Sequence, residues 1–242
     1  MRIALINPNT TASMTRKMAG AAAAIAAPST TIDAITAATG PASIEGYYDE
    51  ALAVPGLLAE LRKSEAAGAD AAIIGCFDDT GLDAARAMAG IPVLGLCESA
   101  LSLASLVAKR ITIVTTDLRA RVPVEELVGR YGMTGKVRVR ATGSPVLELE
   151  DARSPAVSRL KAEIALALDT DHAEAIVLGC AGMADLAQSL QQEFGVPVID
   201  GVGAAVKQAE ALVTLRLTTS KRGAYSFPAP KAFSGYPAGQ HG

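Results

Sequence analysis

Short apolar runs alternate along the chain with longer segments in which apolar residues recur at helical spacing. The short runs are rich in Ile, Val and Ala, and turn residues bound them. Such runs are typical of buried parallel strands, and their alternation with helices is typical of α/β proteins. The pattern predicts helices within Leu57–Ala67, Leu82–Ala89, Val157–Leu168 and Ala184–Glu193. It predicts strands at Arg2–Ile6, Thr31–Ile35, Ala71–Gly75, Val93–Leu96, Arg110–Thr115, Lys136–Arg140, Ala175–Leu178 and Val196–Ile199.

The chain also resembles itself in three ordered segments. Arg2–Asn9 aligns with Arg110–Asp117, and Ala72–Cys76 aligns with Ile176–Cys180. A Pro-centred strand then follows in each half, so that the three shifts are 108, 104 and 105 residues. Val- and Ile-rich strands that end in Gly would give weaker matches of this kind by chance. The ordered matches favour an α/β fold with two pseudosymmetric lobes, each a short parallel sheet flanked by helices, and an active site in the crevice between them.

The repeat predicts where the lobes begin and end. We expect a first α/β lobe over residues 1–100 and a second over residues 101–202, with the helical stretch 203–220 packing back onto the first. Residues 221–242 are rich in Pro and Gly and lack periodicity, which predicts a tail that wraps the surface or stays mobile.

Composition and charge exclude several classes of function. Of the 242 residues, 50% are hydrophobic and 19% are charged, and the net charge of −3 comes without a basic block, which argues against a nucleic-acid partner. The longest apolar run, Ala19–Ala27, is too short to span a membrane. The first strand leads directly into Asn7-Pro8-Asn9, without the apolar stretch of a secretory signal. We therefore expect a cytoplasmic protein with no membrane partner.

The few histidines and cysteines narrow the chemistry further. His172 and His241 are the two histidines, so a histidine-based metal site is not expected, and a Ser-His-Asp triad would depend on His172. Cys76, Cys97 and Cys180 are an odd number without C-x-x-C spacing, which argues against disulfides. We expect no metal and no cofactor, and thiols that act individually.

Two of these cysteines occupy equivalent places in the repeat. Cys76 and Cys180 each follow a strand that ends in Gly, and a helix begins soon after. Parallel sheets bind ligands at this edge, and a helix N-terminus favours the thiolate. Most cysteines are inert and buried, but two thiols that face each other across a crevice suit a different role. One thiolate removes a proton from one face of a carbon while the other thiol delivers a proton to the opposite face.

Four motifs carry a resemblance to a known family. They are Asn7-Pro8-Asn9-Thr10-Thr11, Pro41–Gly46, Gly75-Cys76-Phe77-Asp78-Asp79 and Gly179-Cys180-Ala181-Gly182-Met183. The chain resembles the aspartate/glutamate racemase superfamily from residue 1 to about 225, and within it the hydantoin racemase branch, whose near neighbours are allantoin racemases. The resemblance implies a cofactor-independent two-base mechanism, Cys76 and Cys180 as the two acid/bases, and a cyclic ureide substrate.

The resemblance also implies substrate-binding positions. Polar side chains are expected at strand ends and in a loop over the crevice, and backbone N–H groups after each cysteine are expected to stabilise an enolate oxygen. Capping of strand ends and turns is the alternative role for the polar side chains. Many relatives continue with Gly and Asp-Pro after the first cysteine, so the Asp78-Asp79 pair leaves the substrate preference open. The predicted set is Asn7, Ser43, Phe77, Asp78, Thr115, Thr116, Ala181 and Gly182.

Several functions remain open at this point. The leading interpretation is a racemase of 5-monosubstituted hydantoins, and the alternative is an allantoin racemase with the same mechanism. A decarboxylase would need only one thiol, and a two-lobed binding protein would leave both thiols unexplained. An aspartate or glutamate racemase should place basic groups near the crevice, and the motifs contain none. Apolar helical faces, together with the family habit, predict a homo-oligomer.

Overall fold

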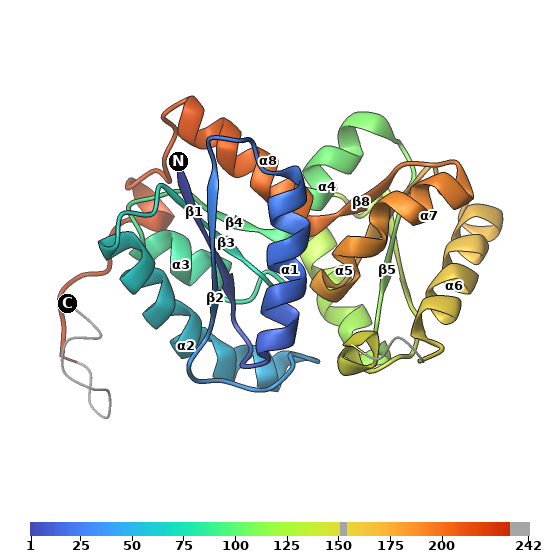
Figure 1. The fold of residues 1–242 in the computed structure, drawn as a ribbon, viewed down its shortest axis with the longest axis horizontal. Coiled ribbons are helices and arrows are strands. Elements are labelled where there is room, and N and C mark those ends of the chain that lie inside the picture. Colours follow the sequence, from blue (N-terminus) through green and yellow to red (C-terminus); the bar gives the residue numbers. More distant parts are fainter. Residues whose placement is uncertain (151–153, 233–242) are drawn as a thin grey trace.

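The fold consists of two parallel sheets that lie side by side (Figure 1). The computed structural model describes residues 1–150 and 154–232. The first sheet has the strand order β2-β1-β3-β4, and the second has the order β6-β5-β7-β8. The strands are β1 (Arg2–Asn7), β2 (Thr31–Thr36), β3 (Ala71–Ile74), β4 (Val93–Gly95), β5 (Ile111–Thr115), β6 (Val137–Ala141), β7 (Ala175–Leu178) and β8 (Val198–Asp200).

Strands are paired at equivalent positions in the two sheets. In the first sheet, Ile6 is paired with Ile74, and Ile74 with Gly95. In the second, Val114 is paired with Leu178, and Leu178 with Asp200. The residues of these pairs are therefore related by the same shifts of 108, 104 and 105 that align the two halves of the sequence. The predicted α/β fold with two similar lobes is confirmed, and all eight predicted strands are present.

Helices flank both sheets. α1 (Ala12–Ile25), α2 (Tyr47–Ala66) and α3 (Leu82–Met88) contact the first sheet, and α5 (Arg121–Arg130), α6 (Ala156–Thr170) and α7 (Ala187–Phe194) contact the second. α4 (Leu96–Val107) follows β4, and α8 (Gly201–Thr214) follows β8. Short 3₁₀ helices complete the fold: η1 (Leu118–Ala120), η2 (Val146–Glu150), η3 (Ala181–Leu186) and η4 (Gly223–Tyr225).

Two helices differ from the sequence prediction. The helix expected to begin at Leu57 begins at Tyr47, because Pro55 is accommodated inside it. The helix expected over Ala184–Glu193 is split between η3 and α7. Tertiary packing determines whether a helix tolerates a proline and where its type changes. The spacing of apolar residues in the sequence therefore predicts neither feature.

One apolar core joins the lobes. Leu5 and Ile73 of the first sheet belong to the same buried cluster as Ile113 and Val177 of the second. α4 packs against α8, α1 contacts η3, and α8 also contacts β3 and β4 of the first sheet. Each lobe also has a buried cluster of its own, around Leu57 in the first and Leu160 in the second, and the proposed boundary between the lobes stays a prediction.

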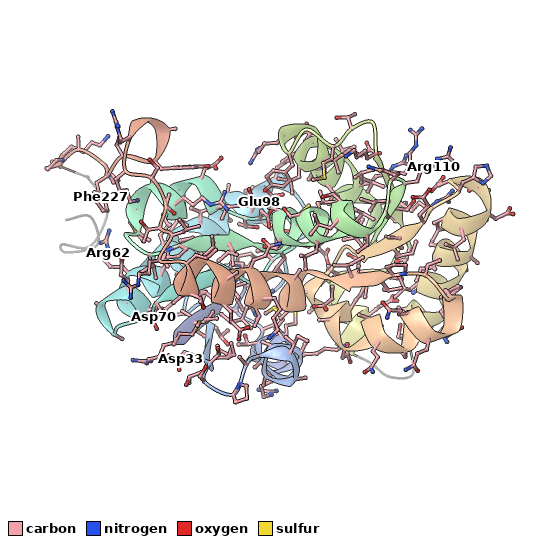
Figure 2. All side chains as sticks on the ribbon, turned by 90° about the horizontal axis from the view of Figure 1, so that it is seen from above. Asp33, Arg62, Asp70, Glu98, Arg110 and Phe227 are labelled. Carbon is pink, nitrogen blue, oxygen red and sulfur yellow. The ribbon has the colours of Figure 1, made fainter. Side chains whose placement is uncertain are left out.

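The described part of the tail lies against α3. Lys221 Nζ donates a 2.6 Å hydrogen bond to the Arg86 carbonyl and lies 4.5 Å from the centre of the Phe227 ring. Figure 2 shows Phe227 and Arg110 at opposite ends of the long axis. Residues 233–242 of the predicted tail lie outside the described residues. None of the helices in the described ranges combines the length and apolarity needed to cross a bilayer.

Candidate active site

The two repeated cysteines line one cleft at the carboxyl edges of the sheets. Cys76 follows β3 and Cys180 follows β7, and both side chains are partly exposed. The cleft opens to solvent, and about 410 Å³ of space lies within its walls and mouth. Its lining consists of Asn9, Met14, Ile44, Gly75, Cys76, Phe77, Asp78, Thr115, Thr116, Ala120, Val146, Gly179, Cys180 and Ala181.

A glycine before each cysteine lets the chain pass close to the neighbouring strand. A Cβ added at Gly179 would lie 2.8 Å from Thr115 Cβ and 2.9 Å from Ile113 Cγ2. A Cβ added at Gly75 would lie 2.9 Å from Met18 Sδ. The Thr115 hydroxyl also donates a 2.9 Å hydrogen bond to the Gly179 carbonyl, which holds the segment ahead of Cys180 in place.

We expect Gly179→Ala to destabilise the protein more than Gly75→Ala. The added methyl group at 179 meets the Cβ and Cα atoms of Thr115, which are part of β5, whereas the one at 75 meets mainly the flexible tip of Met18. Overpacking of this kind costs about 1–3 kcal/mol, and we place Gly179→Ala at the upper end and Gly75→Ala at the lower end. Urea unfolding of the two variants and the wild type measures both values. Equal losses would show that Met18 is held as firmly as the β5 backbone.

The chain makes the same turn after each cysteine. The Asp79 N–H donates to the Cys76 carbonyl at 3.2 Å, and the Met183 N–H donates to the Cys180 carbonyl at 3.0 Å. In the first of these turns, the backbone N–H of Asp78 bonds the Cys76 sulfur. Such N–H groups are suited to stabilising negative charge that develops in the cleft.

The surroundings of Cys76 have opposing effects on the pKa of its thiol. Burial raises the pKa of Cys76 well above its usual value, and the charges of Asp78 and Glu50 raise it further. The Thr80 hydroxyl and the Asp78 N–H lower the pKa, because both stabilise the thiolate. Burial is the largest of these effects, so the protein environment favours the neutral thiol.

The two adjacent aspartates serve different purposes. Asp78 borders the cleft, and burial, followed by the charges of Glu50 and Asp79, raises its pKa to about 7. Asp79 is buried and accepts hydrogen bonds from the backbone N–H groups of Cys97 and Glu98, both at 2.9 Å. Asp79 therefore holds the start of α4 and does not border the cleft. Cys97, in the first turn of α4, is fully buried.

The structure brings most of the predicted binding residues to the cleft. Phe77, Asp78, Thr115, Thr116 and Ala181 are in its lining. Three predicted residues, Asn7, Ser43 and Gly182, are not. The role of each residue in binding substrate stays a prediction.

The buried Asn7 amide has partners within its own loop. Asn7 Nδ2 donates to Asn9 Oδ1 at 2.8 Å and to Thr15 Oγ1 at 3.0 Å, and Asn7 Oδ1 accepts from the Asn9 N–H. Asn7 thereby orders the loop that presents Asn9 to the cleft. The Asn-Pro-Asn motif marked the right loop, and the structure identifies its second asparagine as the lining residue.

Seven lining residues were not in the predicted set, and two of them, Gly75 and Gly179, directly precede the predicted cysteines. Asn9 and Ile44 belong to motifs that the resemblance singled out, so a signal for them existed. Met14, Ala120 and Val146 come from α1, η1 and η2, and nothing in their local sequence distinguishes them from core residues. Packing of these elements around the cleft decides their position.

A loop of the first lobe is bonded to the second lobe beside the cleft. Glu45 Oε1 accepts from the Val146 N–H at 3.1 Å, and Glu45 Oε2 accepts from an Arg119 Nη at 2.8 Å. Ile44 and Val146 line the cleft next to these bonds. Glu45 therefore fixes the position of one wall relative to the other.

Comparison with known proteins agrees with this geometry. Residues 3–209 match the Asp/Glu/hydantoin racemase family. A hydantoin racemase from Pseudomonas sp. (strain NS671) is 46% identical over 97% of this chain and 95% of that protein, and one from Rhizobium meliloti is 48% identical over 98% of each. The solved allantoin racemase from Klebsiella pneumoniae has a TM-score of 0.95 and 46% identity, covering 97% of this chain and 96% of that one. These findings confirm the resemblance, and the chain belongs to the Asp/Glu/hydantoin racemase family.

Proposed function

We propose that this protein is a racemase of 5-monosubstituted hydantoins that works without a cofactor. The observation that carries the proposal is that Cys76 and Cys180, from equivalent strand ends, line the same cleft. Relatives of 46% and 48% identity are hydantoin racemases, which supports a cyclic ureide as substrate.

The proposed reaction transfers one proton at each face of C5. The thiolate of one cysteine takes the C5 proton, so the C–H bond breaks, an S–H bond forms, and the electron pair moves onto the adjacent carbonyl oxygen as an enolate. The thiol of the other cysteine then protonates C5 from the opposite face and becomes the thiolate. Backbone N–H groups of Phe77, Asp78, Ala181 and Gly182 are the proposed stabilisers of the enolate oxygen. The protonation states of Cys76 and Cys180 are exchanged at the end.

The cleft lining supports a neutral ring with an apolar substituent. Met14, Ile44, Phe77, Ala120 and Val146 supply apolar surface. Among the described residues that line the cleft, none is Lys, Arg or His, which argues against a substrate with two carboxylates. Asn9, Thr115 and Thr116 add polar groups at the strand ends, and these are the candidates for binding the imide.

Allantoin is the second candidate substrate. The similarity to a solved allantoin racemase favours it, and the chemistry at the ring carbon is the same. Its ureido substituent needs hydrogen-bond partners, which the apolar part of the lining does not offer. We therefore propose a hydantoin with an alkyl or benzyl substituent as the preferred substrate.

A deuterium experiment tests the proposal. One enantiomer of 5-benzylhydantoin in deuterium oxide should lose optical rotation and acquire deuterium at C5, at a rate proportional to the amount of protein and above that of the enzyme-free solution. The ratio of kcat/KM for 5-benzylhydantoin and allantoin separates the two substrates. Ligand binding without loss of rotation or exchange would instead support the two-lobed binding protein.

We expect Glu45→Ala to raise KM about fivefold, with a smaller change in kcat. The variant removes a hydrogen bond to the Val146 N–H, worth about 1 kcal/mol, and an exposed ion pair, worth less. The wall that carries Ile44 then loses its tie to the second lobe. Initial rates over a range of 5-benzylhydantoin concentrations measure the effect. Arg119→Ala, the matched control, keeps the bond to the Val146 N–H and removes only exposed ion pairs, with Glu45 and Asp117, so it should change KM by less than about twofold.

The cytoplasmic location and the homo-oligomeric state are part of the same proposal. Exposed apolar side chains support self-association: Leu106 is 78% exposed on α4, and Tyr48 is 77% exposed on α2. Sedimentation of the purified protein measures its oligomeric state directly.

A further inference from the structure

A second cavity adjoins the cleft. It opens to solvent, with about 690 Å³ of space within its walls and mouth, and it is bordered by the first turn of α2, the loop after β3, the start of α3 and one side of α5. Asp78 borders both this cavity and the cleft. We call it the acidic cavity, because its lining includes Glu50, Asp78, Asp79, Asp83 and Glu126, opposed by Arg130.

Glu50 lines the acidic cavity together with Asp78, which also lines the cleft beside Cys76. Glu50 Oε1 is buried and has no hydrogen-bond partner among the described residues. The Glu50 charge raises the pKa of Asp78, and the charges of both carboxylates raise the pKa of Cys76, so the three groups influence one another. Burial raises the pKa of Glu50 as well, while Arg130 opposes that rise. A carboxyl such as Asp78, with a pKa of about 7, accepts and releases protons readily at neutral pH.

The second lobe does not repeat this arrangement. The shift of 104 residues that relates Cys76 to Cys180 relates Asp78 to Gly182. The three residues after Cys180 are Ala181, Gly182 and Met183, none of which can carry a proton on its side chain. The loop that follows Cys180 therefore supplies no ionisable side chain equivalent to Asp78.

We propose that Asp78 and Glu50 form a proton relay that connects the Cys76 thiol to solvent in the acidic cavity. The inference rests on the proposed function, because it concerns the proton that Cys76 carries during racemisation. The S–H bond of Cys76 breaks as an O–H bond forms on the Asp78 carboxylate, and Asp78 then releases a proton to Glu50 or to solvent. The reverse sequence protonates Cys76, so protons balance in both directions.

The relay has a consequence for turnover. Each conversion leaves the two cysteines with exchanged protonation states, and the enzyme must restore them before it converts the same enantiomer again. A relay to the acidic cavity lets Cys76 exchange its proton while the substrate fills the cleft. The loop after Cys180 has no carboxyl at the position equivalent to Asp78, so we expect the two enantiomers to differ in how they exchange with solvent.

Deuterium incorporation into unconverted substrate tests the relay. Each enantiomer of 5-benzylhydantoin is incubated separately in deuterium oxide to low conversion. Chiral separation followed by mass spectrometry then gives one ratio for each enantiomer, which is the amount of deuterated remaining substrate divided by the amount of product formed. The enantiomer that Cys76 deprotonates should incorporate deuterium before conversion, because Cys76 exchanges its proton before returning it. Glu50→Gln and Asp78→Asn should each lower that ratio about fivefold, and should leave the ratio for the other enantiomer within about twofold.

The controls separate a relay from other effects. Asp83→Asn changes an exposed carboxyl of the same cavity and should alter neither ratio. A purely electrostatic effect on the pKa of Cys76 changes the turnover of both enantiomers, because Cys76 acts in both directions, and does not lower one ratio selectively. Equal ratios for the two wild-type enantiomers, or ratios unchanged in both relay variants, would overturn the relay while leaving the racemase intact. Absence of product from the wild type would instead overturn the proposed function.

Discussion

Cys76→Ser and Cys180→Ser should each lower kcat for racemisation on the order of 10³-fold, within the range that general acid–base groups contribute. A serine hydroxyl is far less acidic than a thiol, so it neither forms the base nor delivers the proton at a useful rate. Both thiols line the one cleft, and the proposed reaction uses both in each direction, so the two losses should be similar. Polarimetry with each enantiomer of 5-benzylhydantoin measures them.

The two variants should also differ in a specific way. Each retains one thiol, which still removes the C5 proton from the face that it contacts. Cys180→Ser should therefore exchange deuterium into one enantiomer, and Cys76→Ser more slowly into the other because the proposed relay serves Cys76, without inverting either. Cys97→Ala is the matched control, because Cys97 is fully buried at the start of α4, and racemisation should stay within about threefold of the wild type. Racemisation at the wild-type rate in either serine variant would rule out the two-thiol mechanism.

The repeat made most of the fold predictable. Three shifts in the sequence correspond to the strand registers of both sheets, because side chains of buried parallel strands must alternate in the same way in each copy. The Gly-Cys pairs were informative for a related reason. A Cβ at Gly179 would meet Thr115 of β5, and one at Gly75 would have to displace the tip of Met18, so glycine is favoured at both strand ends.

The details of the site depended on contacts that local sequence does not encode. An asparagine at a strand end is suited both to contact a ligand and to order its own loop, and local sequence does not show that the Asn7 amide bonds Asn9 and Thr15. The walls formed by Met14, Ala120 and Val146 come from elements whose approach is set by the shared core. Pseudosymmetry predicts what the lobes share, whereas the carboxyl pair beside Cys76 is a feature of one lobe alone.

The capping of α4 illustrates such a difference. α8 in the second lobe begins after Asp200, whose own carboxylate accepts from the Gly203 N–H at 2.7 Å. The equivalent residue before α4 is Gly95, which has no side chain. Asp79 supplies the missing acceptor from the loop after β3, and a Cβ added at Gly95 would lie 2.3 Å from the Asp79 carboxyl carbon. The cap is therefore present in both lobes, but it comes from a different part of the chain in each.

Asp79→Ala should accordingly destabilise the protein by about 3 kcal/mol at pH 5, because it removes a cap and leaves buried donors without an acceptor. Those donors are the backbone N–H groups of Cys97 and Glu98 and the Tyr131 hydroxyl, which lies 2.6 Å from Asp79 Oδ2. Urea unfolding of the variant and the wild type measures the loss. Tyr131→Phe removes a single donor and should cost about 1 kcal/mol.

The loss should also depend on pH. Burial raises the pKa of Asp79 from its ordinary value of 3.8 to about 6, so the folded state binds this proton more tightly than the unfolded state. The resulting stabilisation is fully present below the unfolded pKa and is lost as the pH rises through about 6, which amounts to roughly 2–3 kcal/mol for a shift of this size. The difference in unfolding free energy between the wild type and Asp79→Ala should therefore narrow from pH 5 to pH 8. A difference that widens over this range would mean that the three hydrogen bonds to Asp79 outweigh the effect of its burial and lower its pKa.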